Sequence, residues 1–254
     1  MSFFNDILTV WQRYGQNILS GIGNTMLIAL AGTIFGLVIG IINGIIRTVP
    51  KSKNPFVEFI QAFVNFIISV YVEVFRGTPM MVQAMLIFWG YAYATGVQLP
   101  LIPSGIVIVS INTGAYITEI VRGGIISIDK GQFEGAASLG MNHMQTMLKV
   151  VIPQVMRNIL PSISNEFVIN IKDTSVLNVI GVTELYFYVN SAGKNSYKLF
   201  PAFVIGCVIY FILTFAVTRV LRLIERLLEG KNSYTIFGSQ TDPQAEIHVK
   251  KEER

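Results

Sequence analysis

Two long stretches of this chain contain no charged residue, and they limit what the chain can fold into. The first runs from Tyr14 to Ile46 and the second from Gly77 to Thr118. A helix crosses the apolar core of a bilayer with about 20 apolar residues, so each stretch is long enough to span a membrane. Only 13% of the residues are charged, against about 25% in soluble domains. We therefore expect an all-α integral membrane protein, which excludes a soluble enzyme and a disordered chain.

The cysteine and histidine content removes several classes of site. The single cysteine, Cys207, excludes an intramolecular disulfide framework, and the two histidines, His143 and His248, form no zinc-ligand pattern. Asp6 and Arg13 interrupt the apolar N-terminus, so we expect no cleavable signal peptide. In a membrane protein, the net charge of +4 is a topology signal and does not indicate nucleic-acid binding.

The apolar runs predict five membrane-spanning helices. The segment 56–75 is ambiguous, because its polar residues recur every three or four positions on a mostly apolar helix. If it crosses alone there are six spans, and if it merges into the next helix there are five. The charge distribution favours five, since six would split the basic residues between the two faces. The predicted spans are 23–47, 68–95, 105–126, 158–182 and 199–219.

Basic residues predict the orientation of the chain. With five spans and the N-terminus outside, 14 of the 19 Lys and Arg residues lie inside and three outside, which follows the positive-inside rule. The C-terminus and the polar tail 227–254 are then cytoplasmic. Residues 1–20 carry apolar side chains at helical spacing, which is typical of an amphipathic helix on the outer interface or of an apolar lead-in to the first span.

The inner segment 130–153 carries the most informative pattern. Glu134 offers a charged anchor, small residues after it allow a partner backbone to approach closely, and Gly140 divides the segment into two helix-sized pieces. This pattern resembles the EAA loop of ABC importer permeases, with matching spacing from Glu134 to Gly140 and on to Pro153. Gly135 stands where the loop usually has alanine, which costs roughly 1 kcal/mol of helix propensity. The predicted ATPase-coupling residues are Glu134, Gly135, Ala136, Ala137, Gly140, Ile152 and Pro153.

Three further motifs narrow the resemblance to permeases for polar amino acids such as histidine, glutamine, glutamate, arginine and cystine. They are Tyr71–Pro79, Asn112–Ile125 and Ile171–Gly181. The resemblance implies a type I ABC importer transmembrane domain over 21–226, with five core helices and a cytoplasmic coupling helix, in the bacterial plasma membrane. It also implies a second permease subunit, two ABC ATPase subunits and an extracytoplasmic amino acid-binding protein.

The chain lacks the means to hydrolyse ATP. It contains no G-x-x-x-x-G-K-[ST] phosphate loop, since the Gly-Lys pairs at 193–194 and 230–231 both lack the upstream glycine. We therefore expect no cofactor in this chain, and expect ATP and Mg²⁺ to be bound by a partner ATPase coupled through the inner segment.

Polar residues inside the third and fourth spans form two stripes. Asn112, Tyr116 and Glu119 share one face of a helix, and Glu166, Asn170 and Asp173 share another. Buried charges are costly and normally face a cavity, so the stripes either line a path for a zwitterion or hold the helices together. The candidate path residues are Asn112, Thr113, Tyr116, Glu119, Asn165, Glu166 and Asn170. The residues assigned to structural motifs are Glu73, Arg76, Gly77, Thr78, Pro79, Lys172, Asp173 and Thr174.

The sequence predicts a permease subunit of an ATP-driven amino acid importer. The alternative is an ion-coupled secondary transporter, which would carry inverted repeats and broken helices, and only Arg76–Pro79 indicates a break. A membrane enzyme fails because no nucleophile, base and metal set is present.

Overall fold

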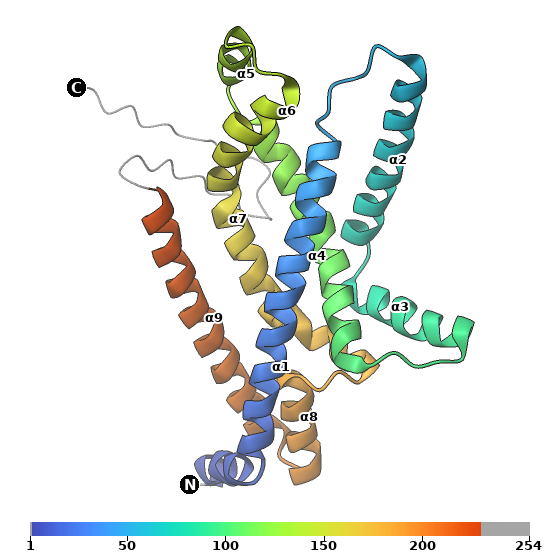
Figure 1. The fold of residues 1–254 in the computed structure, drawn as a ribbon. Coiled ribbons are helices and arrows are strands. Elements are labelled where there is room, and N and C mark those ends of the chain that lie inside the picture. Colours follow the sequence, from blue (N-terminus) through green and yellow to red (C-terminus); the bar gives the residue numbers. More distant parts are fainter. Residues whose placement is uncertain (1, 230–254) are drawn as a thin grey trace, which may run out of the picture.

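The computed structural model describes residues 2–229, which form helices joined by short connections, with no strand among them (Figure 1). The expected all-α fold is therefore confirmed. The helices are α1 Ser2–Ile46, α2 Pro55–Gly77, α3 Met80–Thr95, α4 Leu101–Ile126, α5 Lys130–Ser138, α6 His143–Thr146, the π-helical turn η1 Met147–Val151, α7 Ile152–Asp173, the 3-10 turn η2 Thr174–Ile180, α8 Leu185–Ser196 and α9 Leu199–Glu229.

Five long helices run along one direction of the molecule. Among the described residues, four are long and apolar enough to cross a membrane, namely α1, α2, α4 and α9. The fifth is α7, which has 22 residues and packs against α1, α4 and α9 (Figure 1). It is less apolar because it carries the predicted polar stripe. The short helices α5 and α6 lie at one end of these five, and α8 lies at the other.

The second predicted span, 68–95, is wrong as a single helix. α2 ends at Gly77, and the next residue, Thr78, is extended with φ −124° and ψ 149°. The ring of Pro79 disfavours the helical conformation in the residue before it, and Pro79 itself opens α3. α3 then runs across the direction of α2 (Figure 1). The ambiguous segment is therefore a separate helix that is long and apolar enough to span a membrane, whereas the 16-residue α3 is too short to cross.

The other helices differ from the predicted spans mainly at their ends. α1 runs without interruption through both the expected interface segment 1–20 and the first span. Its early turns pack through Val10 and Ile18 onto α8 and α9, and Asp6 Oδ1 lies 2.7 Å from Lys198 Nζ. α7 begins before the predicted start at 158 and passes into η2 at Thr174. Most of the predicted tail, from residue 230 onward, lies outside the described residues.

A stripe of glycines brings α1 and α4 into close contact. The glycines recur every fourth residue and so share one face of α1. A Cβ atom built on any of them would lie between 2.4 and 2.9 Å from an α4 side chain, which leaves no room for a larger residue. Small residues let membrane helices approach closely enough for extensive van der Waals contact. The stripe consists of Gly32, Gly36, Gly40 and Gly44, opposite Val109, Thr113, Ile117 and Val121.

At the α8 end of the molecule, Glu184 is fully buried and caps α8. Its carboxylate accepts hydrogen bonds from the backbone N–H groups of Tyr186 (2.8 Å) and Phe187 (2.7 Å) and from the Tyr210 hydroxyl (3.0 Å). Burial raises the pKa of Glu184, because the charged form loses its water, while these three hydrogen bonds oppose the rise. The cap therefore fixes α8 to α9.

Candidate functional site

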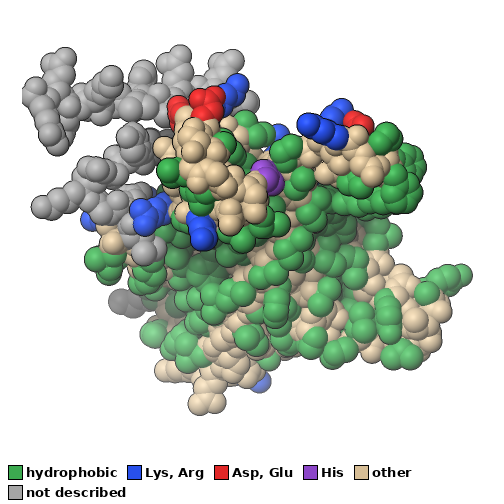
Figure 2. All heavy atoms as spheres, turned by 45° about the horizontal axis from the view of Figure 1, so that its top comes forward, with side chains coloured by type: hydrophobic (Ala, Val, Ile, Leu, Met, Phe, Trp, Pro, Cys, Tyr) green, Lys and Arg blue, Asp and Glu red, His purple; other side chains and the backbone are tan. Residues whose placement is uncertain are grey.

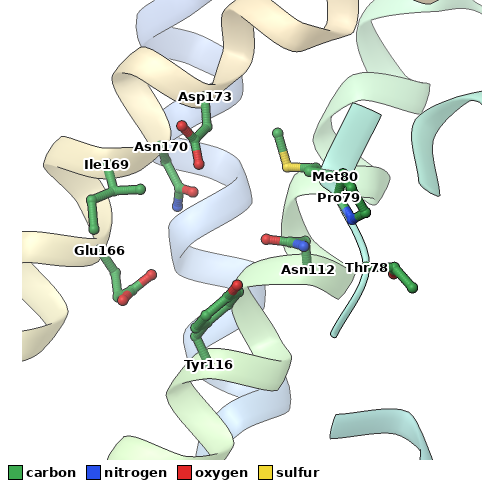
Figure 3. A pocket seen from close by; sticks show the side chains of 9 residues that line it. All are labelled: Thr78, Pro79, Met80, Asn112, Tyr116, Glu166, Ile169, Asn170 and Asp173. Atoms are coloured by element: carbon green, nitrogen blue, oxygen red, sulfur yellow. The ribbon is translucent and has the colours of Figure 1, made fainter. Parts of the chain in front are cut away.

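A pocket of about 170 Å³ lies between α4, α7 and the break that separates α2 from α3. Its lining is mainly polar, and Figure 3 shows the two helices presenting amide and carboxylate groups towards one another. Parts of both predicted polar stripes therefore meet here. The lining residues are Thr78, Pro79 and Met80 from the break, Asn112 and Tyr116 from α4, and Glu166, Ile169, Asn170 and Asp173 from α7.

Asn170 joins three helices behind the pocket. Its Oδ1 accepts a hydrogen bond from Thr113 Oγ1 of α4 (3.1 Å), and its Nδ2 donates one to Thr33 Oγ1 of α1 (2.8 Å). All three residues are buried. Thr113, a predicted path residue, therefore supports the pocket and does not line it. Asn165 is exposed and is not part of the lining.

Glu119 lies outside the pocket, in a cluster of charges near the α5 end of α4. Its carboxylate pairs with Arg47 at the end of α1 and with Arg122, whose Nε and Nη2 lie 3.0 and 2.8 Å away. Arg47 also donates a hydrogen bond to Ser69 of α2 (3.4 Å). The cluster joins α1, α2 and α4, so in this structure Glu119 holds helices together.

The residues assigned to structural motifs divide between several places. Thr78, Pro79 and Asp173 line the pocket, and the Arg76 guanidinium lies 5.5 Å from the centre of the Tyr116 ring, within range of a cation–π contact. Thr174 is buried, whereas Glu73 and Gly77 are exposed. Lys172 lines a second, more open groove of about 430 Å³ beside α9. Within residues 2–229, neither Glu73 with Arg76 nor Lys172 with Asp173 forms an ion pair within 4.0 Å.

The predicted coupling residues lie at the end of the molecule opposite α8. Figure 2 shows charged side chains gathered over α5 and over the start of α2, above hydrophobic flanks. Glu134, Gly135 and Ala137 are exposed, and a Cβ atom on Gly135 would meet nothing within 4 Å. Ala136 is buried against the chain. α5 therefore leaves a carboxylate and two small residues uncovered.

Local sequence signals determine the conformation of residues 130–153, which we call the coupling segment. Asp129 caps α5, and Gly140 turns the chain with φ +74°, a conformation that glycine adopts without steric cost. Asn142 then caps α6 through a reciprocal capping box with Gln145. Ile152 and Pro153 begin α7 directly after the π-helical turn η1.

The coupling segment is attached directly to the helices that form the pocket. The Gln154 side chain of α7 donates a hydrogen bond to Gln132 Oε1 of α5 (3.0 Å). Phe133 packs on a buried apolar cluster that includes Ile117 and Val121 of α4 and Val155 of α7. A movement of α5 would therefore be transmitted to both helices that carry the polar stripes.

Sequence reasoning missed Gln83, which lies in the first turn of α3 and is 5% exposed. Its Nε2 donates a hydrogen bond to the Phe75 carbonyl, and its Oε1 accepts one from Asn112. The available signal was a lone amide in an otherwise apolar run from 79 to 90. Met80 and Ile169, which complete the pocket lining, gave no signal because their residue types are ordinary in a span.

The sequence of this chain is similar to those of known membrane components of transport systems. Residues 55–230 match the family described as "Binding-protein-dependent transport system inner membrane component". The L-cystine transport system permease protein of Bacillus subtilis is 34% identical over 221 residues, covering 87% of this chain and 90% of that protein. The arginine transport system permease protein of Bacillus subtilis is 32% identical over 215 residues, covering 85% and 94%.

A solved structure agrees with the sequence relatives. The crystal structure of an amino acid ABC transporter with histidines superposes with a TM-score of 0.73 at 32% identity, covering 85% of this chain and 95% of that one. The type I importer fold implied by the sequence motifs is confirmed, and the chain is a transport subunit without enzyme activity of its own. The chain belongs to the family of inner membrane components of binding-protein-dependent transport systems.

Proposed function

We propose that this chain forms the translocation path for a polar amino acid in an ATP-driven importer. The observation that carries the proposal is the pocket, where carboxylates and amides from α4 and α7 surround a cavity of about 170 Å³. A zwitterion carries an ammonium group that carboxylates attract and a carboxylate that amides and an arginine can bind. Relatives named for arginine and cystine transport support an amino acid as the substrate.

The proposal assigns energy supply to separate subunits. ATP and Mg²⁺ bind to two ABC ATPase subunits, which dock on the coupling segment through Glu134 and the small residues beside it. Nucleotide binding draws the coupling segments together, and α7 and α4 carry that movement to the pocket. A second permease subunit, either a copy of this chain or a paralogue, completes the membrane domain, and an extracytoplasmic binding protein delivers the amino acid.

The proposed location is the bacterial plasma membrane, with the N-terminus outside and the coupling segment inside. The distribution of basic residues supports this orientation. The helices fit it, because the coupling segment and the end of α9 lie at the same end of the molecule, whereas the start of α1 lies at the other (Figure 1).

Co-purification tests the proposal. The wild-type chain is extracted from membranes and compared with Glu134→Arg, which reverses an exposed charge without disturbing the core, and with the double variant Glu134→Ala, Gly140→Pro. An exposed control at the opposite end, Lys194→Ala, should change nothing. We expect an ATPase to co-purify with the wild type and the control, and to be lost or uncoupled in both coupling variants.

The opposite result would support the secondary transporter. In that case the wild type would purify without an ATPase and would still move an amino acid down an ion gradient.

A further inference from the structure

Gln83 connects the end of α2 to the pocket. The last carbonyl groups of a helix have no partner within the helix. Gln83 Nε2 lies 2.9 Å from the carbonyl oxygen of Phe75 and 2.9 Å from both the carbonyl oxygen and Oγ1 of Thr78. A single buried side chain thus serves the carbonyl groups that the break at Pro79 leaves open.

These contacts fix which way the Gln83 amide points. A backbone carbonyl can only accept a hydrogen bond, so the NH₂ group of Gln83 must face α2. Its Oε1 then faces α4, where Asn112 Nδ2 donates to it at 2.9 Å. The amide of Gln83 therefore has one orientation that satisfies all of its neighbours, and the reversed orientation would place an oxygen against two carbonyl oxygens.

The orientation of Gln83 in turn sets that of Asn112. Asn112 Nδ2 is directed to Gln83 Oε1 and also lies 3.4 Å from the carbonyl oxygen of Phe75. Its Oδ1 is left on the opposite side, and Figure 3 shows this oxygen directed into the pocket, towards Asn170. The carbonyl groups at the end of α2 thus determine which atom of Asn112 a ligand meets.

We propose that Gln83 is a positioning residue that holds the Asn112 amide with its oxygen towards the pocket, so that this wall accepts a hydrogen bond from an N–H group of the ligand. The inference rests on the proposed function, because it assumes that the pocket binds an amino acid. Glu166 and Asp173 line the same cavity with carboxylates, and the Asn170 amide is engaged by Thr113 and Thr33. The ligand group that fits this wall is an ammonium or another N–H-bearing end of the amino acid.

A comparison of two backgrounds tests the role of Gln83. Asn112→Ala removes the amide that Gln83 orients, so positioning has nothing to act on in that background. The complex of permease and ATPase is purified in nanodiscs, and the twenty standard L-amino acids are screened singly for the one that most raises the wild-type melting temperature. Its dissociation constant is then measured by calorimetry for the wild type, Gln83→Met, Asn112→Ala and the double variant. Gln98→Met, at an exposed position after α3, is the matched control.

We expect Gln83→Met to weaken binding about tenfold in the wild-type background, the loss of one oriented hydrogen bond to a charged group. In the Asn112→Ala background we expect the same substitution to change binding by less than about twofold, since the coupling between the two residues is already lost. Gln98→Met should bind like the wild type.

Two results would overturn the proposal. An equal loss in both backgrounds would show that Gln83 only supports the fold, and unchanged binding by Gln83→Met would show that it does not position Asn112. If no amino acid stabilises the wild-type complex, the pocket does not bind an amino acid. Both the proposed function of the pocket and this inference would then be wrong.

Discussion

The pocket lies between α4 and α7, whereas the coupling segment connects the ends of these two helices, and the two regions are built in opposite ways. Around the pocket, Asn112 and Asn170 are nearly inaccessible and are hydrogen-bonded to residues on other helices. In the coupling segment, Glu134 is exposed, as is Leu139 at 82%. Polar groups in an apolar medium need partners within the chain, whereas groups at an aqueous end do not. The pocket wall is therefore determined by this chain, and the coupling surface is suited to a partner.

Glycine shows the same contrast. Gly40 of α1 has no room for a side chain, because a Cβ atom would lie 2.4 Å from Ile117 Cγ2. Gly135 of α5 has open space where its Cβ atom would be. In the core glycine permits close helix contact, and in the coupling segment it leaves a surface uncovered.

The largest effect is expected for Gly40→Ala. The added methyl group must separate α1 from α4 beside the pocket, which should cost about 1–3 kcal/mol of unfolding free energy. Thermal unfolding of the purified protein in detergent measures the change. Gly23→Ala, on the same helix with nothing within 4 Å of its Cβ position, is the control. Equal melting temperatures for the two variants would contradict the close packing.

The next effect concerns Glu119→Gln, which removes the charge shared by Arg47 and Arg122. Both ion pairs are partly exposed, with 20% of the Glu119 side chain accessible, so screening reduces the expected loss to about 1–2 kcal/mol. The control is Glu73→Gln, which changes an exposed carboxylate on α2 and should leave the melting temperature unchanged. Tyr116→Phe should lower uptake and leave melting unchanged. Normal melting with reduced uptake for Glu119→Gln would return this residue to the substrate path.

A smaller effect is expected for Gly140→Ala. The left-handed backbone at φ +74° costs a residue with a Cβ atom roughly 1 kcal/mol. The change should loosen the connection between α5 and α6 and leave global unfolding unaltered. Hydrogen exchange of residues 130–146 detects it, and protection equal to the wild type would show that the turn tolerates a side chain.

The smallest effect on the stability of the chain alone is expected for Gly135→Ala. The substitution should stabilise the free chain and weaken its association with the ATPase. Alanine improves the helix propensity of α5 by up to about 1 kcal/mol and meets no atom of this chain. If an ATPase packs on this face, the methyl group should weaken its association, which titration of the separated subunits measures. A gain in both the stability of the free chain and the affinity for the ATPase would place the partner contact elsewhere on the coupling segment.

Helical spacing was sufficient to predict four of the nine residues that line the pocket. The i, i+4 pairs Asn112 with Tyr116 and Glu166 with Asn170 placed these residues on facing stripes, and the structure brings them together. Spacing does not show how far along a stripe the pocket extends, so Glu119 was assigned to it although it lies about one turn beyond Tyr116, beside Arg47 and Arg122. Asn165 was included for its residue type alone, and its position beside Glu166 turns it away from the pocket.

The second span and Gln83 required information that the sequence holds only in part. Pro79 marked a break, but the distribution of basic residues favoured five spans and so a continuous helix through it. The role of Gln83 depends on the break, because its partners are carbonyl groups that exist only where α2 ends. The glycine stripe on α1 can be read from the sequence, but its partner helix can be identified only once the fold is known.

ATP-dependent uptake into proteoliposomes tests most directly whether pocket and coupling segment are two parts of one importer. The permease and its co-purifying ATPase are reconstituted with the binding protein and with the amino acid that most stabilises the wild-type complex. We expect uptake that requires ATP, needs no ion gradient and is lost in both Glu166→Leu and Glu134→Arg, with ATPase stimulation lost only in the latter. Uptake driven by an ion gradient in the absence of ATP would contradict this assignment.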